Sequence, residues 1–113
     1  MGKKSRFTAD VLHGSLEMLI LRTLAREPAH GYGIARRLEQ ISGDVLQVGE
    51  SSLYPALQRL LVHGWVKAAW RESESGRQAR VYRITPAGRK RLAEESAAFT
   101  RLVGAITTIL QTG

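Results

Sequence analysis

Apolar and polar positions along the chain predict three short helices, then two strands and then one long helix. Residues 14–25 carry apolar side chains around most of a helical circumference, so this first helix must be covered on more than one side. We expect a second subunit to supply part of that cover. The second helix opens at Gly31 and places Ile34, Leu38 and Ile41 at helical spacing, so this stripe is expected to face the core.

The third helix and the two strands follow one another directly. The helix is predicted over residues 51–63, because Pro55 is best tolerated near the first turn of a helix. Strands are predicted over residues 65–71 and 77–84, and the polar turn between them contains Gly76, where a positive φ is expected.

Side-chain alternation predicts the register of this hairpin. Val66, Ala68 and Trp70 would share one face with Tyr82 and Ile84, and that face would pack against the helices. A slip of one residue would place Tyr82 and Ile84 on the solvent-exposed face of the hairpin. Trp70 is therefore expected to point inward.

The last helix is predicted to begin at Pro86, with Thr85 as its cap, and to run to about residue 110. Residues 86–110 would form a helix of about 37 Å, which is too long for a three-helix body to cover. Its distal apolar seam therefore predicts a homodimer. The residues expected at a dimer interface or a ligand pocket are Leu16, Leu19, Ile20, Phe99, Leu102, Val103, Ile106, Ile109 and Leu110.

These elements together predict a mainly α fold with a small β-hairpin wing. A helix followed directly by a basic hairpin is the arrangement of a winged helix-turn-helix. We expect residues 1–85 to form this DNA-binding domain with an N-terminal arm. Residues 86–113 would add a C-terminal dimerisation helix within one compact unit.

The charge of the chain favours a polyanionic partner. The formal net charge is +7 and the isoelectric point is about 10.6. Residues 67–91 alone hold eight Lys or Arg against two Glu, so the positive charge is concentrated on the hairpin and on the residues directly after it. A hydrophobic content of 43% argues against a disordered chain.

The third helix carries the side chains that base reading requires. Gln and Arg can bind purine edges in the major groove, and hydroxyl groups suit phosphates. The alternative is an ordinary surface helix beside a solvated charged hairpin, which the direct succession of the two elements disfavours. The predicted DNA-binding residues are Ser51, Ser52, Tyr54, Gln58, Arg59, Arg77, Gln78, Arg80, Tyr32 and Arg36.

Other functional classes find no support in the sequence. There is no cysteine, and the three histidines are dispersed without carboxylates at ligand spacing, so no metal site is expected. No nucleophile elbow, P-loop or dinucleotide loop occurs, so we expect neither an enzyme nor a cofactor. No apolar run approaches the roughly 20 residues of a membrane span, and we expect a cytoplasmic protein that does not bind membranes.

Several motifs taken together resemble the PadR-like transcriptional regulators, over roughly residues 14–110. They are Gly-Ser-Leu at 14–16, His-Gly-Tyr-Gly-Ile at 30–34, Ser-Leu-Tyr-Pro-Ala-Leu at 52–57, Gly-Trp-Val at 64–66 and Tyr-Arg-Ile-Thr-Pro-Ala-Gly at 82–88. The resemblance implies a winged-helix homodimer, usually a repressor, that binds inverted repeats in double-stranded DNA.

The resemblance also implies roles for two aromatic positions. Tyr54 matches the tyrosine of the family's recognition helix, which implies a contact with the DNA backbone. The single C-terminal helix resembles a compact subgroup that includes multidrug-sensing members, some of which stack planar ligands on a tryptophan of that helix. Here Phe99 is its only aromatic residue, which argues against a flat-drug pocket and leaves Phe99 to line a smaller apolar one.

Two hypotheses of different classes remain. In the first, two recognition helices enter successive major grooves about 34 Å apart, and a small apolar effector wedged between the last helices and the first helix weakens binding. In the second, the winged helix is a protein–protein interaction module in a larger assembly. The clustered charge favours the first, and a partner whose binding is insensitive to salt would favour the second.

Overall fold

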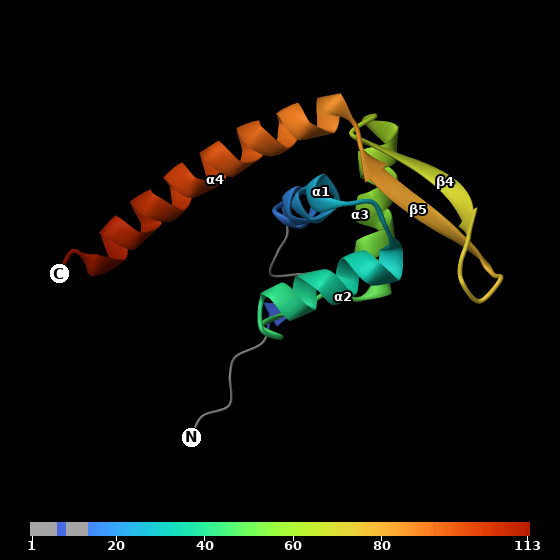
Figure 1. Cartoon of the computed structure of the whole chain (residues 1–113). Helices are drawn as coiled ribbons and strands as arrows, with labels where there is room; N and C mark the ends of the chain where they lie inside the picture. The colour runs from blue at the N-terminus through green and yellow to red at the C-terminus, as the bar shows by residue number, and fades with distance from the viewer. Residues whose placement is uncertain (1–6, 9–13) are drawn as a thin grey trace, which may run out of the picture.

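The structure is a computed structural model that describes Phe7–Thr8 and residues 14–113. A hairpin and a long helix leave a small helical body in opposite directions (Figure 1). The expected N-terminal arm falls largely on residues 1–6 and 9–13, which lie outside the described residues. In chain order the elements are β1 (Phe7–Thr8), α1 (Leu16–Arg26), β2 (Ala29–His30), α2 (Gly31–Ile41), β3 (Leu46–Gln47), α3 (Glu50–Val62), β4 (Val66–Glu72), β5 (Gln78–Ile84) and α4 (Pro86–Gln111).

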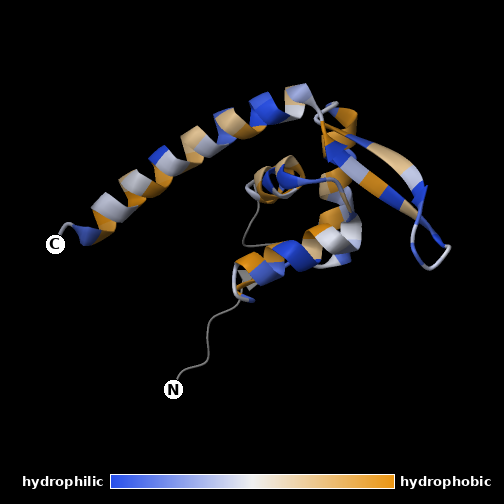
Figure 2. Ribbon diagram, in the orientation of Figure 1, coloured by the Kyte–Doolittle hydropathy of each residue, from blue (hydrophilic) through white to orange (hydrophobic). Residues whose placement is uncertain are grey.

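The long helix α4 begins where the sequence predicts. The Thr85 hydroxyl accepts a hydrogen bond from the Gly88 N–H at 3.0 Å and donates one to the Gly64 carbonyl at 2.7 Å. Leu92 is buried against the body, and from residue 97 onward every position is exposed. The distal half of α4, with its recurring apolar residues, therefore overhangs the body (Figure 2) and contributes to a longest dimension of 58 Å.

Helix α1 lies at the centre of the body, in contact with α2, α3, α4 and β5. Ile20 is fully buried and Leu16 is 6% exposed within the chain's own core, while Leu19 is half-buried against it. The second covering surface of α1 therefore comes from α4 of the same chain. The first turns of α4 thus supply cover that the sequence analysis expected from a second subunit, and a contact of α1 with a second copy stays a prediction.

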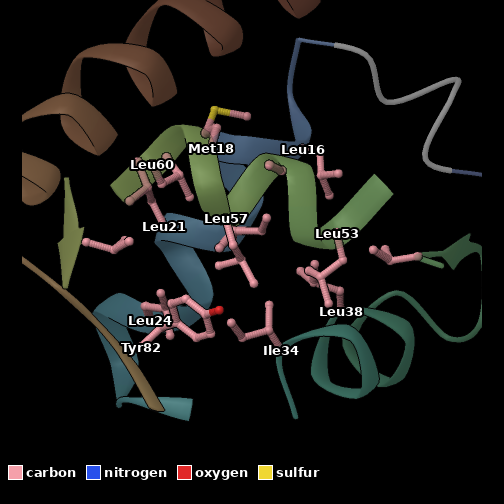
Figure 3. Packing of buried hydrophobic residues seen from close by; sticks show 14 of the residues in the cluster. Leu16, Met18, Leu21, Leu24, Ile34, Leu38, Leu53, Leu57, Leu60 and Tyr82 are labelled. Atoms are coloured by element: carbon pink, nitrogen blue, oxygen red, sulfur yellow. The ribbon is translucent and has the colours of Figure 1, made fainter. Parts of the chain in front are cut away.

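The core is one cluster in which α1, α2 and α3 meet the sheet (Figure 3). Ile34 and Leu38 of α2 are buried in it, as expected. Ile41, the third member of the predicted stripe, is 67% exposed, so that prediction was wrong. It is the last residue of α2, where the helix has run past the elements that cover the first two.

Helix α3 begins one residue earlier than predicted, at Glu50, and is followed by Gly64 with φ +74°. Leu53, Leu57 and Leu60 form the inward stripe. Pro55 lies inside the helix, just past its first turn. It sits on the exposed side, where water can satisfy the carbonyl that loses its intrahelical partner.

The antiparallel sheet has the order β2-β5-β4, while β1 and β3 form a separate parallel pair. The hairpin has the predicted register, with Val66 opposite Ile84, Ala68 opposite Tyr82 and Trp70 opposite Arg80. The inward orientation of Trp70 was predicted wrongly, because its side chain is 67% exposed. Alternation gives the correct face of the strand, but the hairpin has already left the helical body at this position.

Candidate nucleic-acid interface

The outward side of α3 is set by its inward leucines. Ser51, Tyr54 and Gln58 follow one another at spacings of three and four residues, so they lie along one face of the helix, and all three are exposed. Ser52 is half-buried at the edge of this face. The sequence therefore placed the outward face of α3 correctly.

Tyr54 packs across the start of α2. A Cβ atom on Gly31 would lie 2.7 Å from the Tyr54 hydroxyl oxygen, so only glycine leaves room for the ring in this position. The Tyr54 side chain is 44% exposed. Partial burial raises its pKa above the usual value, and the charge of Glu50 and the nearby Tyr82 add to the effect. Tyr54 therefore keeps its proton and can donate a hydrogen bond to an acceptor such as a phosphate oxygen.

The start of α2 places two more predicted residues beside this tyrosine. His30 caps the helix, since its Nδ1 accepts a hydrogen bond from the Gly33 N–H at 3.1 Å. Arg36 donates to the Tyr32 hydroxyl at 3.2 Å and its guanidinium carbon lies 5.7 Å from the centre of the Tyr32 ring. Tyr32, Arg36 and Tyr54 all line a hollow of about 180 Å³ between α2 and α3. The structure thus brings together three residues that were predicted on two separate helices.

Arg59 has a partner inside the chain. Its Nε donates to the Glu17 carboxylate of α1 at 2.5 Å, and its side chain remains 56% exposed. Arg59 and Ser52 are seven residues apart on α3, so they share the side of the helix that faces α1. Ser52 and Arg59 therefore lie to one side of Tyr54 and Gln58, toward α1.

A groove of about 620 Å³ lies on that side of α3. The half-buried Trp65 stacks on the His63 ring at 4.3 Å between centres, and the Arg91 guanidinium carbon lies 4.7 Å from the Trp65 ring. Arg91 also pairs with Glu95 at 2.9 Å. The groove is lined by Gly14, Leu16, Glu17, Met18, Leu21, Ser51, Ser52, Pro55, Arg59, Trp65, Arg91 and Glu95.

The wing carries the remaining predicted residues. Arg77, Gln78 and Arg80 are exposed, and Gly76 of the tip has the expected positive φ, +84°. Within the described residues, none of the arginines of β4, β5 and their turn forms an ion pair with a carboxylate. The Arg80 guanidinium carbon lies 5.7 Å from the centre of the Tyr82 ring. These cations are available to an external anion.

Sequence reasoning missed two contributors to this surface. Glu17 was not considered as a partner of Arg59, because 42 residues separate them and only the packing of α1 on α3 joins them. Trp70 was assigned to the core. The charged residues Arg71 and Glu72 directly after it were the available sign that the strand was leaving the body.

Comparison with known proteins decides the family. The model of the transcriptional regulator PadR-like family matches residues 20–94, which include α2, α3 and the whole hairpin. The chain belongs to this family. Its members are transcriptional regulators and not enzymes, in agreement with the expectation from sequence.

Relatives and solved structures agree with the family. A protein of 37.1 kDa in transposon TN4556 of Streptomyces fradiae is 42% identical over 90 residues, which are 80% of this chain and only 24% of that protein. The transcriptional regulator Rv3488 of Mycobacterium tuberculosis is 34% identical over 88 residues, 78% of each chain. The structure of a transcriptional regulator from Clostridium thermocellum has a TM-score of 0.83 at 25% identity, covering 90% of this chain and 99% of that one.

The PadR-like chain is therefore a transcriptional regulator with a mainly helical winged-helix fold and a small antiparallel sheet. The family match ends at residue 94, so most of the overhanging part of α4 lies beyond it. Among the described helices, none combines the length and the apolar character needed to cross a membrane.

Proposed function

We propose that this PadR-like chain represses transcription as a homodimer bound to an inverted repeat in double-stranded DNA, and that a small apolar ligand releases it. The observation that supports DNA binding most directly is the exposed face of α3 next to unpaired wing cations. Ser51, Tyr54 and Gln58 face outward on α3, and Arg77 and Arg80 extend beyond it without carboxylate partners among the described residues. Polar side chains on a helix with flanking cations meet the needs of base reading and phosphate contact.

The homodimer is supported by the uncovered side of α4. Phe99, Val103 and Ile106 are 41–45% exposed, and Leu102, Ile109 and Leu110 are 56–80% exposed. These positions recur every three or four residues, so they form one apolar stripe, which matches the pattern of a helix that packs on another helix. A second copy would cover the stripe and would set the distance between two recognition helices.

Release by a ligand is supported by the groove between α1, α3 and α4. Its volume of about 620 Å³ lies within the range of small-molecule sites, and Leu16, Met18 and Leu21 give it an apolar floor. Glu17 and Arg59 lie at its edge and join α1 to the recognition helix. A ligand that displaces either side chain would disturb α3, and Phe99 of either copy is the aromatic residue expected to complete the pocket.

The test of DNA binding is a fluorescence anisotropy titration against duplex DNA from upstream of the gene for this protein. A scrambled duplex serves as the comparison, and both are titrated over a series of salt concentrations. We expect tight binding to the native fragment that weakens steeply with salt, because each phosphate contact releases counterions and adds to the slope.

Two variants assign the binding to this surface. Tyr54→Ala and Arg80→Ala should each weaken binding while the fold is retained, whereas Arg101→Ala removes the same charge from the distal part of α4 and should not. Unchanged affinity in both interface variants would contradict the assignment. Weak, salt-insensitive and equal binding to both duplexes would contradict the repressor and favour the protein-interaction module.

A further inference from the structure

Trp70 is a large aromatic side chain that the fold leaves in water. It lies on β4 with 67% of its surface exposed, whereas Trp65, five residues earlier, is half-buried and stacked between charged or polar groups. Single exposed apolar residues are common on protein surfaces, so exposure alone assigns no role. Its position in the sheet, however, gives Trp70 a charged neighbour.

Trp70 stands directly opposite Arg80 in the hairpin. The two residues share a face with Ala68 and Tyr82, and the Arg80 guanidinium carbon lies over the Tyr82 ring at 5.7 Å. Tyr82 is buried in the core cluster that also contains Leu53 and Leu57 of α3. Arg80 and Tyr82 therefore connect the exposed part of the hairpin to the core beneath α3.

This face has the chemistry of a DNA backbone contact. Arg80 supplies the cation of this face, with Glu72 two residues beyond Trp70, whereas Lys67, Arg71 and Arg83 lie on the other face of the hairpin. None of the hairpin arginines is ion-paired in the described part of the chain. The sugar–phosphate backbone alternates an apolar ring with an anion. Indole offers an apolar surface and one N–H donor, and guanidinium offers a cation, so a neighbouring Trp and Arg complement that alternation.

We infer that Trp70 and Arg80 together grip the sugar–phosphate backbone of duplex DNA, with the indole against a deoxyribose and the guanidinium on an adjacent phosphate. The inference rests on the proposed DNA binding and adds to it the residue and the face of the wing that make the contact. Trp70 thereby positions the wing on the duplex. It carries no base specificity of its own, because the backbone is the same at every sequence.

The experiment uses the emission of Trp70 itself. Trp65→Phe leaves Trp70 as the sole tryptophan of the chain, and Trp70→Phe leaves Trp65. Each full-length variant is titrated with a dye-labelled duplex, so that dye anisotropy reports binding while tryptophan emission and acrylamide quenching report the ring. We expect acrylamide quenching of Trp70 to fall about twofold on binding, because the ring leaves water, while that of Trp65 stays unchanged.

Affinity measurements give a second readout. Trp70→Ala should weaken binding about fivefold, whereas Trp70→Phe, which keeps a ring, should cost about twofold or less. Arg71 follows Trp70 on β4, and its side chain lies on the opposite face of the hairpin from Trp70 and Arg80. Arg71→Ala is therefore the matched control for Arg80→Ala. The effects of Trp70→Ala and Arg80→Ala should be non-additive, and those of Trp70→Ala and Arg71→Ala should add.

The outcomes separate this inference from the proposed function. If anisotropy never rises with any duplex, DNA binding itself fails and the inference fails with it. If duplex binds while Trp70 emission, quenching and the Trp70→Ala affinity stay unchanged, the inference alone is overturned. A response of Trp70 to single-stranded DNA but not to duplex overturns it as well.

Discussion

The Glu17 carboxylate of α1 accepts a hydrogen bond from Arg59 Nε of α3 at 2.5 Å. This pair joins α1, at the centre of the body, to α3, the proposed recognition helix, and both residues line the same groove. It also affects the role of Arg59, which the sequence analysis predicts to bind DNA. In this structure Arg59 is occupied by a carboxylate, so a DNA phosphate and Glu17 would compete for it.

That competition gives the first prediction. Glu17→Gln should strengthen DNA binding by up to about fivefold, because the guanidinium is freed for phosphate. Unfolding in urea should show a stability change below about 1 kcal/mol, because the pair is partly exposed to solvent. Glu94→Gln on the exposed side of α4 is the control for net charge. An equal gain from Glu94→Gln would show that bulk charge, and not the release of Arg59, is the cause.

Gly31 provides the second prediction, through its contact with Tyr54. Gly31→Ala would place a methyl group 2.7 Å from the Tyr54 hydroxyl oxygen, so the ring must move. We expect weaker DNA binding by anisotropy with little loss of stability, since the clash involves the far end of a side chain. Gly33→Ala is the matched control, because its methyl group would lie no closer than 3.4 Å to His30. An identical loss of affinity in both variants would argue that α2 itself, and not Tyr54, is disturbed.

The ionisation of Tyr54 gives the third prediction. Its pKa is raised by partial burial first and by the negative charge of Glu50 second, so it should ionise above the value of about 10 for free tyrosine. In the unfolded chain the pKa of Tyr54 is that of free tyrosine. The contribution of Tyr54 to folding stability is therefore fully present below this unfolded-state pKa, and it is lost as the pH rises through the higher pKa of the folded state. Ultraviolet absorbance titration of the wild type minus Tyr54→Phe measures this transition. Glu50→Gln should move it downward, and a Tyr54 transition at or below the free value would contradict the contact geometry.

Gly88 gives the fourth prediction, which concerns the junction of the wing and α4. A Cβ atom there would lie 2.0 Å from the Trp65 carbonyl oxygen, and a backbone atom cannot move aside as a flexible side chain can. Gly88→Ala should therefore destabilise the protein by about 1–3 kcal/mol. Gly104→Ala on the same helix has open space around it and should stabilise by up to about 1 kcal/mol through helix propensity. Urea denaturation compares the two, and equal effects would contradict the close approach of Gly88 to the Trp65 backbone.

The fifth prediction addresses the apolar stripe of α4. Replacement of Ile106 and Leu110 by Asp should convert the proposed dimer into monomers, because each carboxylate would be buried against an apolar partner helix. Thr108→Asp with Gln111→Asp adds the same charge away from the stripe and should leave the dimer intact. Sedimentation velocity measures both. Survival of the dimer in the first variant would mean that the copies associate elsewhere.

The local elements could be predicted from the sequence because each depends on neighbours in the chain. Thr85 and Pro86 define the start of α4, and the hydroxyl cap is present as expected. The alternation of Val66, Ala68, Tyr82 and Ile84 determined the hairpin register, because a slip would expose both large side chains of β5. These features need no knowledge of the tertiary arrangement.

Tertiary structure decided how far the helical body extends and which charges meet. The spacing of hydrophobic residues, two in a strand and 3.6 in a helix, predicts the face on which a side chain lies. It does not show where the neighbouring elements that cover this face end. Trp70 lies on the predicted face of β4 and Ile41 at the predicted spacing in α2, but both are exposed, because no described element covers those ends of β4 and α2. Arg59 and Glu17 are 42 residues apart in the sequence, and they meet only because α1 packs on α3, which no local sequence pattern predicts.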